Sequence, residues 1–181
     1  MAADTFRFLI MSDTHGDIDI MTRIVGIHRD DCTNFFHLGD SEVSPYVVNS
    51  LFLGVRGNCD YYVGLPVTRD VHFPFGIVHL EHGNRFDGIT EEYIDSVGCK
   101  IFLFGHTHRK FLGRTRSGVW VMNPGSLVLP RDGKLGSYLI AEIDNQSGEV
   151  RKAEFHLVEP DTGREVECLD GLKEHGLLRN F

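Results

Sequence analysis

Short apolar runs separated by Gly, Asp, Asn and Pro residues recur along the first part of the sequence. Runs of this length that are rich in Phe, Ile, Leu and Val are typical of buried β-strands. We expect strands at residues 6–11, 34–38, 51–55, 67–73, 76–80 and 100–104. Apolar positions between residues 18 and 32 instead recur at the spacing of a helix that buries one face. Shorter helices are expected at 45–49, with Pro45 at the first helical position, and at 90–96, with Thr90 as a cap.

The pattern changes to hairpins in the later part of the chain. Strands are expected at residues 111–115, 119–122, 137–143 and 149–158, with turn residues between them. Strand–helix alternation predicts parallel strands and meanders predict antiparallel ones, so the fold class is α/β, a mixed-sheet β-sandwich flanked by helices. A length of 181 residues fits one domain. We assign it to residues 1–158, followed by a C-terminal extension at 159–181 with a weak helix at 165–174.

Composition and charge narrow the classes of function. Hydrophobic residues make up 41% of the chain, enough for a sizeable core, and the formal charge is −8 at pH 7. This charge argues against long nucleic acids as partners, because their affinity depends on Lys and Arg contacts to phosphate. A run long and apolar enough to span a membrane is lacking, as is a signal-peptide pattern. The four cysteines form no C-x-x-C pair, so we expect a cytoplasmic protein with reduced thiols.

Metal-ligating side chains follow five of the apolar runs, and the densest group is the pair His106 and His108 after the run 101–104. A single His-x-His is equally consistent with a solvated loop, but ligands collect beyond the carboxyl ends of strands in open α/β sheets. The candidate ligands are Asp13, His15, Asp40, Asn58, His82, His106 and His108. This mixture of oxygen and nitrogen donors suits Mn, Fe, Co, Ni or Zn. Seven ligands are too many for one tetrahedral zinc site and suit two ions that share a bridging carboxylate.

These residues stand in five ordered motifs: DTH at 13–15, GD at 39–40, GNCD at 57–60, HG at 82–83 and GHTH at 105–108. A sixth, NPGS at 123–126, is followed by LVLPR. Over residues 6–143 the sequence resembles the calcineurin-like metallophosphoesterase superfamily, and within it the small YfcE-type phosphodiesterase branch. The resemblance implies a metallo-dependent phosphatase-like four-layer fold. It also implies a metal-dependent phosphoric ester hydrolase, a phosphodiesterase that acts on small phosphate esters.

The same resemblance implies roles for individual residues. One metal ion would be held by Asp13, His15 and His108, and the other by Asn58, His82 and His106, with Asp40 as the bridge. Manganese is the expected ion, with Fe, Ni, Co or Zn as alternatives, and metal-bound hydroxide would attack phosphorus. We expect the catalytic residues to be Asp40, Asn58, Asp60 and His82. Asp60 would orient Asn58 or a metal-bound water, and the alternative is a turn aspartate.

Two positions depart from the family pattern. Cys59 stands where the family's protein phosphatases have a histidine that acts as general acid, so we expect a packing residue there and a preference for good leaving groups. Asn84 stands where a second histidine is common, which leaves the substrate open. The alternative function is a non-catalytic metal-binding scaffold, as in a retromer subunit that shares this fold with degenerate motifs. The edge hairpins could also pair subunits into a homo-oligomer.

The remaining histidines carry no metal-site pattern in the sequence. We expect His37 to pack within its strand and His28 to lie on the first helix. His79 alternates with Glu81 away from the face of His82. Three further histidines have no partner pattern: His72, His156 and His175.

Overall fold

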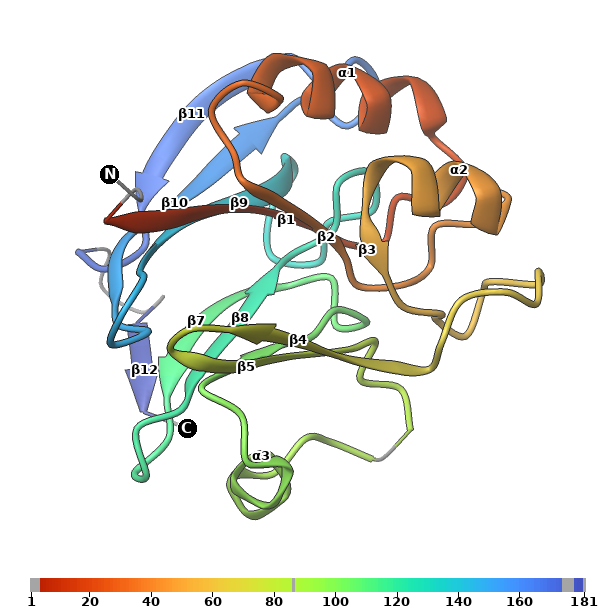
Figure 1. Ribbon diagram of the computed structural model, residues 1–181. Helices are drawn as coiled ribbons and strands as arrows, with labels where there is room; N and C mark the ends of the chain where they lie inside the picture. Colours follow the sequence, from red (N-terminus) through yellow and green to blue (C-terminus); the bar gives the residue numbers. More distant parts are fainter. Residues whose placement is uncertain (1–3, 86, 174–177, 181) are drawn as a thin grey trace.

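The computed structural model describes residues 4–85, 87–173 and 178–180 and contains two six-stranded sheets that face each other (Figure 1). The first sheet has the order β11-β10-β9-β1-β2-β3. Its strands are β1 (Thr5–Met11), β2 (Asn34–His37), β3 (Leu53–Gly54), β9 (Gly136–Asp144), β10 (Val150–Val158) and β11 (Glu165–Asp170). The second sheet has the order β12-β7-β8-β6-β5-β4. Its strands are β4 (Thr68–Phe73), β5 (Gly76–Glu81), β6 (Ile101–Leu103), β7 (Lys110–Arg114), β8 (Trp120–Pro124) and β12 (Leu178–Asn180).

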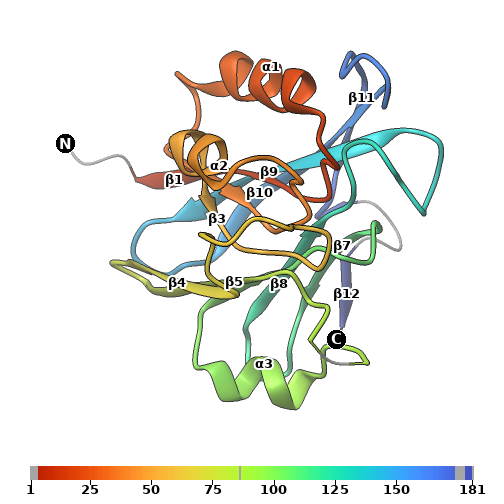
Figure 2. The same ribbon diagram turned by 90° about the vertical axis from the view of Figure 1, so that its right-hand side faces the viewer.

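Helices cover the outer faces of both sheets and complete four layers. The helices are α1 (Ile18–His28), α2 (Pro45–Leu51) and α3 (Glu91–Val97). Figure 2 shows α1 and α2 above the first sheet and α3 below the second. The expected mixed-sheet sandwich with flanking helices is therefore confirmed. No helix in the described part of the chain is long and apolar enough to span a membrane.

The side chains of β1 show why this strand is apolar throughout. Phe8 and Ile10 face the core between the two sheets, whereas Leu9 and Met11 face the cluster beneath α1 and α2. Helices on one face and a second sheet on the other leave no solvated side, so alternation with polar residues is absent. Phe8 also contacts Phe73 of the second sheet, with ring centroids 5.1 Å apart. Loss of a buried side chain of this size costs about 3–5 kcal/mol.

Parallel pairing brings the candidate loops to one edge of the sandwich. β1 pairs parallel with β2, and β2 with β3. In the second sheet, β5 pairs parallel with β6, and β6 with β8. Strands that run the same way end at the same edge, so the segments after β1, β2, β3, β5 and β6 can meet there. These five segments carry the candidate ligands.

Several element boundaries and assignments differ from the sequence expectation. The helix expected at 165–174 is wrong, because residues 165–170 form β11 and pair antiparallel with β10. The short strand β12 was not expected, and it pairs parallel with β7. Helix α1 ends at His28 rather than at residue 32, and α2 continues to Leu51, so that β3 is only two residues long. His175 lies outside the described residues.

Candidate metal centre

The loops at the shared edge adopt an uncommon backbone conformation. Outside glycine, the described residues with positive φ are Asp13, His15, Asp40, Glu42, His106 and His108. Left-handed φ in residues with a Cβ costs of the order of 1–3 kcal/mol each and clusters at functional sites. The conformation is held by hydrogen bonds between loops, because Asp13 N donates to Gly39 O at 3.0 Å and His15 N donates to Asp40 O at 3.1 Å. Five of the six strained positions are ligands expected from the sequence.

One group of donor atoms comes from Asp13, His15 and His108. The Oδ1 atom of Asp13 lies 3.1 Å from Nε2 of His108, and the two Nε2 atoms of His15 and His108 are 3.5 Å apart. Asp13 is fully buried and its Oδ2 accepts hydrogen bonds from Ser12 and from the amide of His106. Its Oδ1 has no hydrogen-bond partner. An ionised carboxylate oxygen that is buried in this way fits a position next to a cation.

A second group adjoins the first and comes from the segments after β2, β3 and β5. The Nε2 atom of His82 lies 3.2 Å from Asp40 Oδ2, 3.1 Å from Asn58 Oδ1 and 4.0 Å from Asp13 Oδ1. The ring of His106 lies beside that of His82, with centroids 5.1 Å apart. Asp13, Asp40 and His82 also form a cluster of donor atoms of their own. The seven ligands expected from the sequence therefore lie in one neighbourhood, with Asp40 and Asp13 at its middle.

Three of the four imidazoles are oriented by a partner on their other nitrogen. The Nδ1 atoms of His82 and His108 face the carbonyl oxygens of Leu38 and Leu129, each at 2.7 Å. The Nδ1 atom of His15 lies 2.5 Å from the carboxylate of Glu42. An acceptor at Nδ1 places the proton there and leaves the Nε2 lone pair pointing inward, which is the usual arrangement of histidines that bind a metal.

The electrostatics of the cluster favour ionised carboxylates. Burial raises the pKa of Asp13, but the close approach of the His108 imidazole and the charge of His82 outweigh it and hold the pKa below its usual range. Burial likewise opposes ionisation of Asp40, whereas contacts with His82 and Cys59 bring its pKa below the ordinary value. The pKa of His82 is raised, because the two carboxylates overcome its desolvation by burial. A divalent cation can take over the role of this positive charge.

Two glycines allow the loops to approach one another closely. A Cβ on Gly57 would lie 2.1 Å from Asp40 Oδ1, and a Cβ on Gly105 would lie 2.0 Å from Ser12 Oγ. Neither contact is sterically possible, because a Cβ atom never lies this close to an atom to which it is not bonded. The glycines of the 57–60 and 105–108 motifs are thus required by the packing of ligand-bearing loops, independent of any turn type.

Asp60 fixes the loop that carries Asp40. Its Oδ2 accepts hydrogen bonds from the amides of Asp40 and Gly57 at 2.9 and 2.8 Å. Its Oδ1 accepts from Ser41 Oγ at 2.9 Å and from the amide of Glu42 at 2.7 Å. These contacts orient the Asp40 loop rather than Asn58. The catalytic role of Asp60 stays a prediction.

Several supporting residues were missed by the sequence reasoning. Glu42 orients His15, and Ser126 Oγ donates to the carbonyl oxygen of Asp13 at 2.8 Å. Asn123 Nδ2 donates to Gly105 O at 2.8 Å, which ties the 123–126 motif to the 105–108 loop. The 123–126 motif pointed to the contacts of Asn123 and Ser126. The sequence carried no comparable signal for Glu42, apart from its position two residues after Asp40. His37 packs within its strand as expected, with Nε2 3.0 Å from Thr14 Oγ1.

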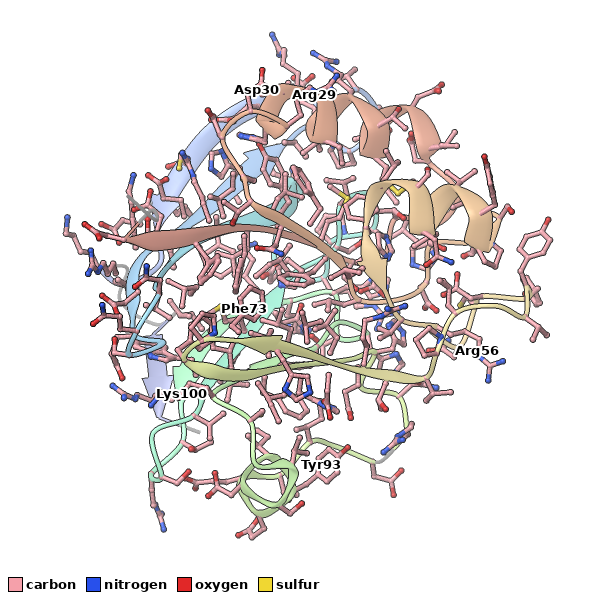
Figure 3. The ribbon with its side chains drawn as sticks, in the orientation of Figure 1. Arg29, Asp30, Arg56, Phe73, Tyr93 and Lys100 are labelled. Carbon is pink, nitrogen blue, oxygen red and sulfur yellow. The ribbon has the colours of Figure 1, made fainter. Side chains whose placement is uncertain are left out.

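Two cavities open beside the cluster. One of about 410 Å³ is bounded by His106, Phe104, Ile89 and Asn84 among others. The other, of about 270 Å³, lies beside Asn58 and is bounded by Arg56, Arg85 and Asn84. Figure 3 shows Arg56, which belongs to the segment after β3, at the right-hand edge of the molecule. Apolar and cationic walls next to candidate metal ligands are suited to the organic and phosphate parts of an ester.

Residues 6–146 match the family model of the calcineurin-like phosphoesterase superfamily domain. The chain belongs to this superfamily. A relative in this superfamily, the probable metallophosphoesterase YsnB of Bacillus subtilis, is 29% identical over 156 residues, covering 79% of this chain and 88% of YsnB.

Solved structures show the same fold. A conserved uncharacterised protein of Streptococcus pneumoniae, described as a predicted phosphoesterase, has a TM-score of 0.74 at 24% identity, covering 93% of this chain and 99% of its own. A structure described as a novel archaeal phosphodiesterase has a TM-score of 0.65 at 21% identity, covering 84% of this chain and 100% of its own. Membership of the calcineurin-like phosphoesterase superfamily, together with the buried Asp/His cluster, makes this protein a probable metallophosphoesterase whose cluster is consistent with divalent metal ions.

Proposed function

We propose that the protein is a phosphodiesterase that hydrolyses small phosphate esters with two divalent metal ions. The observation that carries the proposal is the buried, unpartnered Oδ1 of Asp13, which faces the inward-pointing Nε2 atoms of His82 and His108. One ion would be held by Asp13, His15 and His108 and the other by Asn58, His82 and His106, with Asp40 between them. Manganese is the ion we expect, and Fe, Co, Ni or Zn also suit these donors. When bound, such a pair supplies Lewis-acid stabilisation of a phosphate and lowers the pKa of water.

The protein's own residues prepare the site for this chemistry. Glu42, Leu38 and Leu129 hold the imidazoles in the tautomer that presents Nε2 to the cluster. Arg56 and Arg85 adjoin the cavity next to Asn58, where they can attract the anionic ester. The archaeal relative described as a phosphodiesterase supports the same activity here.

Cys59 bears on whether the protein itself provides a nucleophile. Burial and the neighbouring Asp40 raise the pKa of the Cys59 thiol to about 11, so it stays protonated at neutral pH. These surroundings therefore disfavour a thiolate nucleophile at this position. We infer direct attack of water on phosphorus, without a covalent intermediate on the protein.

Hydrolysis of bis(p-nitrophenyl) phosphate with added Mn²⁺ tests the proposal. We expect Asp40→Asn to abolish turnover, because it weakens the bridging ligand. Asp30→Asn is the matched control, because Asp30 is exposed beyond the end of α1 (Figure 3) and should leave the rate unchanged.

Parallel assays on p-nitrophenyl phosphate separate a diesterase from a monoesterase. A higher kcat/KM for the monoester would contradict the phosphodiesterase assignment. Metal uptake by the wild type without turnover of any ester in a panel of nucleotides, cyclic nucleotides and sugar phosphates would contradict an enzyme and support a scaffold.

A further inference from the structure

A second group of metal-ligating side chains lies away from the candidate metal centre, on the far side of the first sheet. Glu154 and His156 stand two apart on β10, and Cys168 is the direct cross-strand partner of His156 on β11. Because side chains two apart on a strand share a face, all three point to the same side of this antiparallel pair. Their donor atoms lie within 4.8 Å of one another. This group was not expected from the sequence, because residues 165–174 were predicted to form a helix.

The imidazole of His156 is held with one nitrogen engaged and the other directed at Cys168. Its Nδ1 lies 2.9 Å from Oε2 of Glu165, and the ring of Tyr138 stacks on it at 4.8 Å with an angle of 12°. The Tyr138 hydroxyl donates to the same Glu165 oxygen at 3.4 Å. Glu165 accepts a hydrogen bond from Nδ1–H, so the lone pair of Nε2 faces the sulfur. A carboxylate behind a histidine is the usual support of a metal-binding imidazole.

The separation of sulfur and nitrogen suits a tetrahedral ion. Cys168 Sγ lies 4.0 Å from His156 Nε2. Zinc bonds of about 2.3 Å to sulfur and 2.1 Å to nitrogen place two tetrahedral ligands about 3.6 Å apart. A small rotation of the exposed Cys168 side chain closes this difference, whereas His156 is only 8% exposed and is fixed by its neighbours.

Glu154 supplies the third candidate ligand, and its carboxylate forms an ion pair with Lys152. Its Oε1 lies 2.7 Å from Nζ of Lys152, a side chain that is 47% exposed. A carboxylate has two oxygens, so one can keep the lysine while the other binds a metal ion. Glu165 and Asp170 add negative charge around the sulfur, and Lys152 is the positive charge that opposes it.

We propose that Glu154, His156 and Cys168 form a zinc site that clips the edge strand β11 to β10. Thiolate, imidazole and carboxylate are each zinc ligands in proteins, and a water molecule would complete the tetrahedron. Binding forms a zinc–sulfur bond, and the thiol proton leaves to solvent. Among the residues that the structure describes, β11 is an edge strand that hydrogen-bonds only to β10 within its sheet. The ion would add a second connection to β10 and so protect this edge from pairing with another chain.

Titration of the purified full-length protein with Co²⁺ tests the site, because a cobalt–thiolate bond gives a charge-transfer band in the near ultraviolet. We expect the band in the wild type and its loss in Cys168→Ser, together with one zinc equivalent fewer per chain. Cys59→Ser is the matched control, because Cys59 adjoins the candidate metal centre and its loss should leave the band in place. A band that persists in Cys168→Ser, or that disappears in Cys59→Ser instead, would overturn the proposal.

Two further measurements keep the test decisive if Cys168→Ser folds poorly. Zn²⁺ should slow iodoacetamide labelling of Cys168 in the wild type at least tenfold, as followed by mass spectrometry of its peptide.

The Lys152→Gln variant should bind zinc several-fold more tightly than the wild type, because the substitution removes the cation that competes for Glu154. If the Glu154–Lys152 pair were purely structural, zinc affinity would not increase. Unchanged labelling in the presence of zinc would refute the site. His156→Gln should abolish this protection and leave ester hydrolysis near the wild-type rate.

Discussion

The Nε2 atoms of His15 and His108 lie 3.5 Å apart, although 93 positions separate the two residues in the sequence. The Nδ1 atom of each ring faces an acceptor, which is Glu42 for His15 and the Leu129 carbonyl oxygen for His108. Both Nε2 atoms therefore present lone pairs to each other in the neutral tautomers. Two facing lone pairs repel unless a cation lies between or beside them, so the fold holds these rings in an arrangement that a metal ion completes.

Metal binding should consequently stabilise the folded chain. At Mn²⁺ concentrations about 100 times the dissociation constant, we expect the free energy of unfolding to rise by about 2.7 kcal/mol. For a chain of this size the melting temperature should rise by about 5–11 °C in thermal scans with and without Mn²⁺. His108→Gln should lose most of this shift, and His72→Gln, on the exposed side of β4, should keep it. An equal shift in both variants would contradict the assigned ligands.

Asp60→Asn should lower both stability and activity without touching a metal ligand. The substitution exchanges one carboxylate oxygen for an amide NH₂, which would face the backbone N–H donors of Asp40 and Gly57 or of Glu42. An unsatisfied donor of this kind costs about 1–3 kcal/mol. Urea unfolding should show this loss, and kcat should fall because the Asp40 loop shifts. Wild-type kcat in a destabilised Asp60→Asn protein would mean that Asp60 supports the fold alone.

The leaving group should control the rate strongly, because Cys59 is a poor acid. We expect hydrolysis rates to fall steeply along a series of diesters whose leaving groups increase in pKa. Cys59→His should raise the rate on alkyl esters at least tenfold and leave the p-nitrophenyl ester nearly unchanged, since general acids matter most for poor leaving groups. Cys59→Ser is the control and should keep the steep dependence. A shallow dependence in the wild type would indicate another proton donor.

His79 should make stability depend on pH. Burial opposes its charge, but the hydrogen bonds with Glu81 and Asp70 outweigh burial and raise its pKa. Its Nδ1 lies 2.6 Å from Asp70 Oδ1 and its Nε2 lies 3.4 Å from Glu81 Oε2. A raised pKa in the folded state gives stability that is fully present below about pH 6.5, the pKa of an unperturbed histidine, and lost as the pH rises through the folded pKa.

His79→Gln should therefore destabilise the protein more at pH 6 than at pH 9. We expect a loss of about 1.5–3 kcal/mol at pH 6, the range for hydrogen bonds to a charged group. Urea unfolding at both pH values measures the difference. His72→Gln, two positions from Asp70 on the same strand, should cost the same small amount at both pH values. An effect of His79→Gln that grows at alkaline pH would reverse the assigned sign.

The sequence was informative where local pattern and topology agree. Asp13, Asp40 and His106 each follow a short apolar strand, and parallel pairing alone brings strand ends together. The left-handed backbone at these residues could not be predicted from residue type, because none of them is glycine and Asp and His adopt positive φ only occasionally. The support of His15 by Glu42 depends on two loops meeting, which a single sequence does not encode as a pattern.

Long-range pairing explains the main failures. Residues 165–170 contain glutamates that suit a helix, yet pairing with β10 decides in favour of a strand. His156 looked isolated in the sequence, and its partner Glu165 comes from that misassigned segment. Once the strand was missed, the Glu154, His156 and Cys168 group could not be seen.

Two strands that come late in the sequence border earlier ones, since β11 pairs with β10 and β12 pairs with β7. During synthesis, β10 and β7 must therefore wait with unpaired edges until residues 165–180 have emerged from the ribosome. A nascent chain paused before that point would offer two open templates for pairing with another molecule. Stop codons placed before residue 165 should for this reason yield aggregates.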